Sequence, residues 1–248
     1  MLVLLPPSET KADGGDGPPL DLDALSRPEL TPTRRKLAEA LVELATDVPA
    51  SLAALGITAR QADEVTRNAN LWTAPTMPGL HRYTGVLYDA LDLKSFRKPA
   101  LAKAETRLAV ASALFGVVTG TDRIPAYRLS GGNSLPALGS LRSVWKPALE
   151  PVLRDIDGLV VDLRSGTYAT LAKLRPDAVT VRVVTEDAAG NRKTVSHFNK
   201  AYKGKLAAVL ATAPREPSTV EQLLGVASRA GLTVERSGEY QLELLTGD

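Results

Sequence analysis

The sequence predicts an α/β protein: one compact domain, residues 1–248, in which helices surround a mixed β-sheet. Continuous apolar runs at residues 2–5 and 158–163 are typical of strands buried on both faces. Segments with helical spacing of leucine lie between such runs, which favours an interleaved α/β order. Alternation at residues 179–185, followed by a turn and a second run at 193–198, indicates an antiparallel hairpin and therefore a mixed sheet.

In the first half of the chain, the strand at 2–5 ends at two prolines, and a polar loop that includes Ser8 and Lys11 follows it. Residues 12–19 are rich in Gly, Asp and Pro, which predicts an irregular segment. Four helices are then expected from leucine spacing, threonine caps and a stop at Gly56. Their expected ranges are 33–45 capped by Thr33, 51–55, 58–71 capped by Thr58, and 101–114.

In the second half, a helix at 142–153 carries Trp145 and Leu149 on one face and leads to the buried strand at 158–163. The hairpin follows this strand. Two further helices and two short strands then close the chain. Their expected ranges are 200–210, 219–230 capped by Ser218, 232–236 and 240–245.

The composition excludes several kinds of chemistry. The chain has no cysteine, so disulfides, iron–sulfur clusters, zinc ribbons and thiol nucleophiles are excluded. The two histidines, His81 and His197, exclude a histidine-rich metal site, and no metal or cofactor is expected. Thirty basic and 28 acidic side chains leave a net charge of +2, which does not by itself indicate nucleic-acid binding. With neither a signal peptide nor a membrane span, a cytoplasmic protein is expected.

Lys200 and Lys203 lie where a strand is expected to end and a helix to begin, within SHFNKAYKGK. Cations are disfavoured there, because the helix dipole already places partial positive charge at the N-terminus. A bound phosphate or carboxylate would offset this cost, since free backbone N–H groups and both lysines can hold it. The sequence therefore favours an anion site, with a solvated basic face as the alternative.

Two further loops carry polar residues. Arg123, Tyr127 and Arg128 follow a helix and can form a bidentate clamp for a carboxylate or phosphate; alternatively, Arg123 pairs with Asp122 or Asp162 and only fixes the loop. Tyr83 and Tyr88, close to Leu and Val, are expected to pack in the core, with stacking on a nucleic-acid base as the alternative.

Asp162, Ser165 and Tyr168 follow the buried strand, where α/β sheets bind ligands. With His197 they are the candidates for proton transfer. A Ser165–His197–Asp162 triad can be drawn, but the GxSxG motif is absent. The dinucleotide and P-loop glycine motifs are absent as well.

Six segments in this order resemble the YaaA family of bacterial peroxide-stress proteins. They are LVLLPPSETK, RYTGVLYDAL, LFGVVTGTDRIPAYRLS, SVWKPAL, DLRSGTYATL and SHFNKAYKGKLA, and they span residues 2 to about 210. The resemblance implies a compact α/β fold with a helix-hairpin-helix element and a positively charged cleft. It also implies binding to DNA, damaged or branched forms included, and limitation of free iron under hydrogen peroxide. Residues 108–122 are where we expect the helix-hairpin-helix element.

Two functional hypotheses follow. In the first, the chain is a cytosolic, monomeric protein of the peroxide response that binds DNA without sequence preference. In the second, it is an enzyme acting on a small nucleotide-like or carboxylate-bearing anion in the same cleft; a scaffold with no site of its own is a third alternative. The residues expected to bind DNA or the anion are Lys11, Arg123, Tyr127, Arg128, Lys200 and Lys203, and those expected to transfer protons are Asp162, Ser165, Tyr168 and His197.

Overall fold

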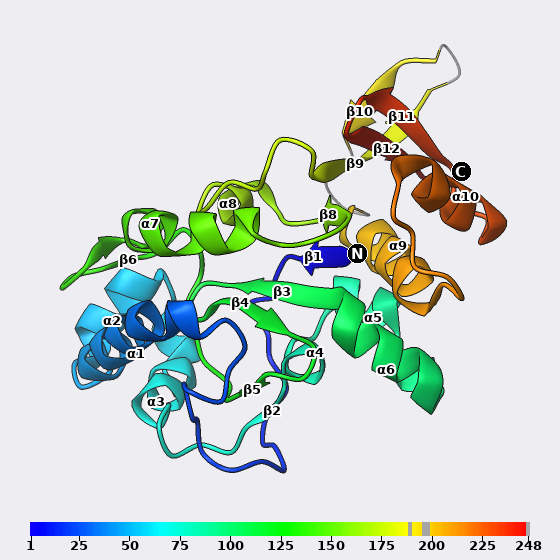
Figure 1. Ribbon diagram of the computed structural model, residues 1–248. Helices are drawn as coiled ribbons and strands as arrows, with labels where there is room; N and C mark the ends of the chain where they lie inside the picture. The colour runs from blue at the N-terminus through cyan, green and yellow to red at the C-terminus, as the bar shows by residue number, and fades with distance from the viewer. Residues whose placement is uncertain (188–189, 195–198, 247–248) are drawn as a thin grey trace.

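A computed structural model describes residues 1–187, 190–194 and 199–246, and within these residues an eight-stranded mixed sheet forms the centre of the protein (Figure 1). Its strand order is β11-β12-β9-β8-β1-β3-β4, and β10 pairs with β9 in addition. The strands are β1 (Leu2–Leu5), β3 (Leu108–Ser112), β4 (Gly116–Thr119), β8 (Val160–Asp162), β9 (Val179–Glu186), β10 (Arg192–Thr194), β11 (Val234–Gly238) and β12 (Gln241–Leu245). Two small two-stranded sheets pair β2 (Met77–Pro78) with β5 (Arg123–Ile124) and β6 (Ser134–Leu135) with β7 (Gly139–Ser140).

The order of the parallel strands creates a switch point beside β1. β1 lies between β3 and β8 and runs parallel to both, with Val3 opposite Leu108 on one side and Val161 on the other. The chain leaves β1 toward β3, whereas it leaves β8 toward β9, in the opposite direction along the sheet. The loops after β1 and β8 therefore diverge, and open α/β sheets bind their ligands at such a point.

The helices form two groups around the sheet. Figure 1 shows α1, α2 and α3 together on one side and α5, α6 and α9 together on the other, with α10 beside the strands β9 to β12. The helices are α1 (Thr31–Leu44), α2 (Val48–Leu55), α3 (Asp63–Ala69), α4 (Gly79–Arg82), α5 (Val86–Leu91), α6 (Lys98–Arg107), α7 (Leu141–Arg154), α8 (Gly166–Ala169), α9 (Asn199–Thr212) and α10 (Val220–Arg229). In the described part of the chain, no helix combines the length and the apolar character that crossing a bilayer requires.

Replacing Gly204 with alanine is expected to lower the free energy of unfolding by about 1 to 2 kcal/mol, because overpacking strains a close-packed contact. An added Cβ would lie 2.2 Å from the backbone oxygen of Leu87 and 2.9 Å from Cβ of Ala90, where α9 crosses α5. Gly225→Ala is the control: it also lies inside a helix, but its Cβ would meet only a side-chain nitrogen of Arg229, at 3.4 Å. Urea unfolding of both variants tests this, and equal stability changes would contradict it.

The structure confirms the predicted fold class and most predicted elements. The strand at 2–5 has the predicted bounds, and the helices predicted at 33–45, 142–153, 200–210 and 219–230 lie within two residues of α1, α7, α9 and α10 at both ends. The caps differ: the side chain that caps α10 is that of Thr219, which accepts a hydrogen bond from Gln222, rather than that of Ser218.

The helix-hairpin-helix element predicted at residues 108–122 is wrong. The segment holds β3 and β4, an antiparallel pair in which Val110 faces Val118. The helix predicted at 101–114 therefore ends at Arg107, and its second half is strand. Gly116 explains the turn: its φ of +75° suits glycine, and an added Cβ would lie 2.8 Å from the Trp145 ring.

Candidate functional site

Lys11 is the central side chain of the candidate site, and the loop after β1 buries it. The residue is 7% exposed, and its amine donates hydrogen bonds to the backbone oxygens of Ser8 (3.2 Å) and Glu9 (3.4 Å). A β-bridge joins the backbones of Lys11 and Tyr83, the residue after α4, and fixes the end of the loop. The loop thus directs a lysine inward at the switch point of the sheet.

Two tyrosine rings cover this amine. Nζ of Lys11 lies 4.2 Å from the centre of the Tyr127 ring and 5.5 Å from that of Tyr83, both cation–π distances. The two phenol oxygens are 3.0 Å apart, and that of Tyr127 is also 2.8 Å from Oγ of Ser112, which accepts a hydrogen bond from the backbone of Phe115. Burial raises the pKa values of both tyrosines, so both remain protonated. A buried hydroxyl chain therefore runs from Tyr83 through Tyr127 to Ser112 at the end of β3, and the rings of its two tyrosines face the Lys11 amine.

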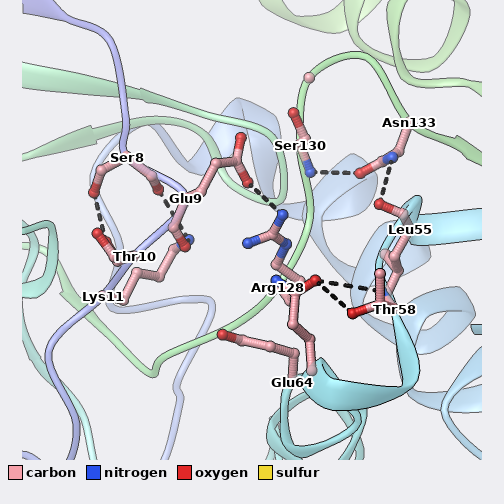
Figure 2. A network of polar contacts seen from close by, with 12 residues as sticks. Ser8, Glu9, Thr10, Lys11, Leu55, Thr58, Glu64, Arg128, Ser130 and Asn133 are labelled. Atoms are coloured by element: carbon pink, nitrogen blue, oxygen red, sulfur yellow. Dashed lines mark hydrogen bonds and ion pairs between the residues drawn. The ribbon is translucent and has the colours of Figure 1, made fainter. Parts of the chain in front are cut away.

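Arg128 provides a second cation beside the loop. Its guanidinium lies 3.4 Å from the carboxylate of Glu9, as Figure 2 shows, and its Nε has no hydrogen-bond partner in the described part of the chain. Asn68 fixes the backbone of Arg128 through two hydrogen bonds, of 2.7 Å from the arginine N–H and 2.9 Å to its carbonyl. The site thus contains an arginine with an immobile backbone and one unused donor.

Burial lowers the pKa of Lys11 to about 7. Glu9 opposes this decrease and Arg128 adds to it, with smaller effects from Glu64 and Arg67. Among the described residues no carboxylate lies within 4.0 Å of the Lys11 amine. Burial therefore favours the uncharged form of this amine, and an uncharged amine is both a base and a nucleophile.

Among the described residues that were predicted for proton transfer, Tyr168 is the one that the structure brings to this cluster. It is 7% exposed, and its hydroxyl oxygen accepts a hydrogen bond of 3.0 Å from the backbone of Gly131. Burial raises its pKa, and the nearby charge of Glu9 adds to the effect. The residue lies in α8, which follows β8, so the β8 side of the switch point also contributes a side chain to the cluster.

The other residues predicted for proton transfer have different surroundings. Both oxygens of Asp162 accept hydrogen bonds of 2.9 Å from the guanidinium of Arg164, which occupies the carboxylate. Ser165 is exposed and precedes α8 without capping it by its side chain. His197 lies outside the described residues, so the triad stays a prediction.

The two lysines of α9 that were predicted to bind an anion differ from each other. Lys200 is exposed in the first turn of the helix. Lys203 is 8% exposed, and its amine donates hydrogen bonds to the backbone oxygens of Leu163 (2.9 Å) and Arg164 (3.2 Å), so it joins α9 to the end of β8. These carbonyls supply the partial negative charge that the sequence argument assigned to a bound anion.

Arg123 lies in β5 and contacts the irregular segment after Lys11. Its guanidinium forms an ion pair with Asp16, which is largely exposed. The alternative pairing of Arg123 with Asp122 or Asp162 is therefore wrong: Asp122 instead accepts hydrogen bonds of 2.7 Å from the backbone N–H groups of Ser26 and Thr119.

Two pockets adjoin the cluster. One, of about 310 Å³, is lined by Tyr83, Thr84 and Tyr88, among others, and the other, of about 280 Å³, by Asp13 and Arg67, among others. The first is at the lower limit of volumes typical of small-molecule sites. In the described part of the chain, no group of three or more His, Asp or Glu side chains could hold a metal ion.

Sequence reasoning missed Tyr83, Ser112 and Glu9 as members of the cluster. Tyr83 was expected to pack in the core; it is buried and stacks on Tyr88 with ring centres 5.7 Å apart, but it also faces the Lys11 amine. Ser112 ends a strand that the sequence predicted as helix, so its position at a sheet edge was not visible. Glu9 lies two residues before Lys11 in the polar loop, and this spacing was the available signal.

Comparison with known proteins decides the family. Residues 1–237 match the family model described as "Peroxide stress protein YaaA". The chain belongs to this family. UPF0246 proteins of two corynebacteria are similar to it over 99% of both chains, at 51% identity in Corynebacterium efficiens and 47% in Corynebacterium glutamicum. A UPF0246 protein of Streptomyces coelicolor is 45% identical over 90% of this chain and 89% of its own. YaaA-family membership covers the switch point and every residue of the cluster.

Proposed function

We propose that this chain is an enzyme of the peroxide-stress response that acts on a small anionic substrate, nucleotide-like or carboxylate-bearing. The observation that carries the proposal is the buried amine of Lys11, which has no carboxylate ion pair among the described residues. It lies at the switch point between β1 and β8, where α/β sheets bind ligands. A buried cation without a counter-ion is costly, and this cost is typical of functional sites.

The cluster offers separate groups for binding and for proton transfer. The guanidinium of Arg128 is already paired with Glu9 at 3.4 Å, but its free Nε can bind a substrate carboxylate or phosphate. Lys11, Tyr127 and Tyr168 lie beside it and can accept or donate protons. The balance of charges at this site favours a small anion over a long phosphate backbone, because Glu9 and Glu64 lie next to the cations.

Small phosphorylated and carboxylated metabolites are expected to raise the melting temperature of the wild-type protein, since a ligand at 100 times its Kd stabilises by about 2.7 kcal/mol. Arg128→Gln should abolish this response, because it removes the free donor and leaves the backbone held by Asn68. Arg142→Gln, on the exposed face of α7, is the control and should respond like wild type. The proposal fails if no such compound stabilises the wild-type protein at saturating concentration.

DNA binding, with protection of DNA and limitation of free iron, is a second candidate. The family supports it, and so do two cations: Lys200, which is exposed in the first turn of α9, and Arg123, whose side chain is 38% exposed and pairs with Asp16. These residues would belong to a positively charged cleft that neutralises phosphates without reading bases. The effect on iron is proposed as indirect, because a chain with no cysteine and two histidines has few ligands for iron.

If this second function holds, the double variant Lys200→Ala, Arg123→Ala binds duplex DNA more weakly than wild type. The slope of log affinity against log salt should fall by about 1.8, since each lost phosphate contact removes about 0.9. Gel-shift titrations with single-stranded, duplex and junction DNA measure it, beside a Lys36→Ala, Arg142→Ala control that removes two exposed cations elsewhere. An unchanged salt slope in the first variant would exclude these residues from the DNA contact.

A further inference from the structure

The surroundings of the Lys11 amine match those of lysines that react with carbonyl groups. The amine is 7% exposed and makes two hydrogen bonds to backbone oxygens, and aromatic rings face it instead of a carboxylate. Arg67, in contrast, pairs with both Glu64 (3.0 Å) and Asp13 (2.6 Å) close by. The fold therefore pairs Arg67 and Arg128 with carboxylates and leaves Lys11 without an ion pair among the described residues.

Imine formation needs more than a neutral amine, and the neighbouring groups supply the rest. A hydrogen-bond donor must polarise the carbonyl oxygen, and the hydroxyl chain of Tyr83, Tyr127 and Ser112 provides donors beside the amine. A base must accept a proton from nitrogen, and Glu9 is the carboxylate whose charge acts most strongly on the Lys11 amine. Arg128 can hold an anionic group on the same substrate.

We infer that Lys11 forms an imine with the aldehyde or ketone group of an anionic substrate, an inference that rests on the proposed small-anion site. The lone pair of Nζ attacks the carbonyl carbon, and the electrons of the C=O π bond move to oxygen, which takes up a proton. The nitrogen loses a proton to give the carbinolamine. The hydroxyl oxygen takes up a second proton and leaves as water as the C–O bond breaks, while the nitrogen lone pair forms the C=N bond of a protonated imine, which can then lose its N–H proton. No oxidant or reductant is needed.

The structural alternative is that Lys11 only closes the loop after β1 through its bonds to Ser8 and Glu9. That role requires a hydrogen-bond donor but no nucleophile. Lys11→Arg retains donors and positive charge, and its guanidinium does not form imines under these conditions. A covalent adduct that is present in wild type and absent in Lys11→Arg is therefore a readout that a structural role would not change.

The experiment traps the imine by reduction. The protein is incubated at pH 7 with glyceraldehyde 3-phosphate, with propanal, or with a DNA duplex carrying one abasic site, each with sodium cyanoborohydride, and adducts are located by peptide mass mapping. Labelling at Lys11 is expected to be at least tenfold faster than at the exposed Lys36. The difference should shrink toward pH 10, as Lys36 also loses its proton. Labelling of exposed lysines without Lys11 would overturn the inference.

The substrate arms separate this inference from the proposed function. If Lys11 is labelled faster by the phosphorylated aldehyde than by propanal, and Arg128→Gln removes this difference in rate, the result supports both the imine and the anion site. Equal labelling of Lys11 by both small aldehydes supports the imine and contradicts the anion site. Stabilisation by anions without any adduct at Lys11 overturns the imine and leaves the anion site. Adduct formation with abasic DNA, beyond that with either small aldehyde, supports the imine and identifies DNA as the source of the carbonyl.

Discussion

Replacing Arg82 with methionine is expected to lower the free energy of unfolding by about 4 kcal/mol, because it leaves several buried carbonyls without a donor and each such loss costs about 1 to 3 kcal/mol. Arg82 is the last residue of α4 and is fully buried. Its guanidinium donates to the backbone oxygens of Ile124 (3.1 Å), Gly14 (2.9 Å) and Pro75 (3.2 Å), and to that of Ala12. These bonds join the segment after Lys11 to β5 and to the residues before β2.

Urea unfolding monitored by tryptophan fluorescence measures the change, because Trp145 is fully buried. Arg142→Met makes the same chemical change on an exposed face of α7 and should alter stability by no more than about 0.5 kcal/mol. Arg82→Lys separates the loss of hydrogen-bond donors from the loss of charge. It keeps the positive charge, but one ammonium group has three donors for four carbonyls. A difference of less than about 1 kcal/mol between Arg82→Met and the control would show that water replaces the guanidinium.

The sequence predicts the centre of the fold well because β1 is apolar at each position and lies between two parallel strands. The secondary structure of Leu108–Ser112 was harder to predict, because its run of Leu, Ala and Val is also apolar. Periodicity alone does not distinguish a buried helix from a buried strand. The decision depends on Gly116, whose positive φ lets β4 fold back on β3. That pairing is a tertiary contact, and a single sequence does not show it.

The candidate site was predictable only in part, for a similar reason. Lys11 and Tyr168 follow strands, and the rule that ligands bind at strand ends was sufficient to select them. Tyr83 reaches Lys11 only because α4 lies against the end of the sheet, which depends on the whole fold. For Lys203, the helix-dipole argument correctly required a negative partner near the amine. That partner is a pair of backbone oxygens and not a bound anion.

Lys11→Met is expected to remove a dependence of stability on pH. Burial lowers the pKa of Lys11 from 10.5 to about 7, so between these values the unfolded chain binds the proton and the folded protein does not. The destabilising contribution of Lys11 is therefore full below pH 7 and declines as pH rises toward 10.5. The stability of wild type relative to Lys11→Met should rise by about 2 kcal/mol between pH 7 and 9, since each unit of pKa difference corresponds to 1.36 kcal/mol.

Urea unfolding of both proteins at pH 6, 7, 8 and 9 measures this difference, and comparing the two proteins cancels the titration of groups that they share. Glu9, Glu64, Arg67, Arg128, Tyr83 and Tyr127 surround the amine, and all six side chains are present in both proteins. Lys36→Met, at an exposed position on α1, should show no such trend. A constant difference between wild type and Lys11→Met from pH 7 to 9 would mean that the Lys11 amine is hydrated and fully charged, and the nucleophile proposed at the switch point would then lack its neutral form.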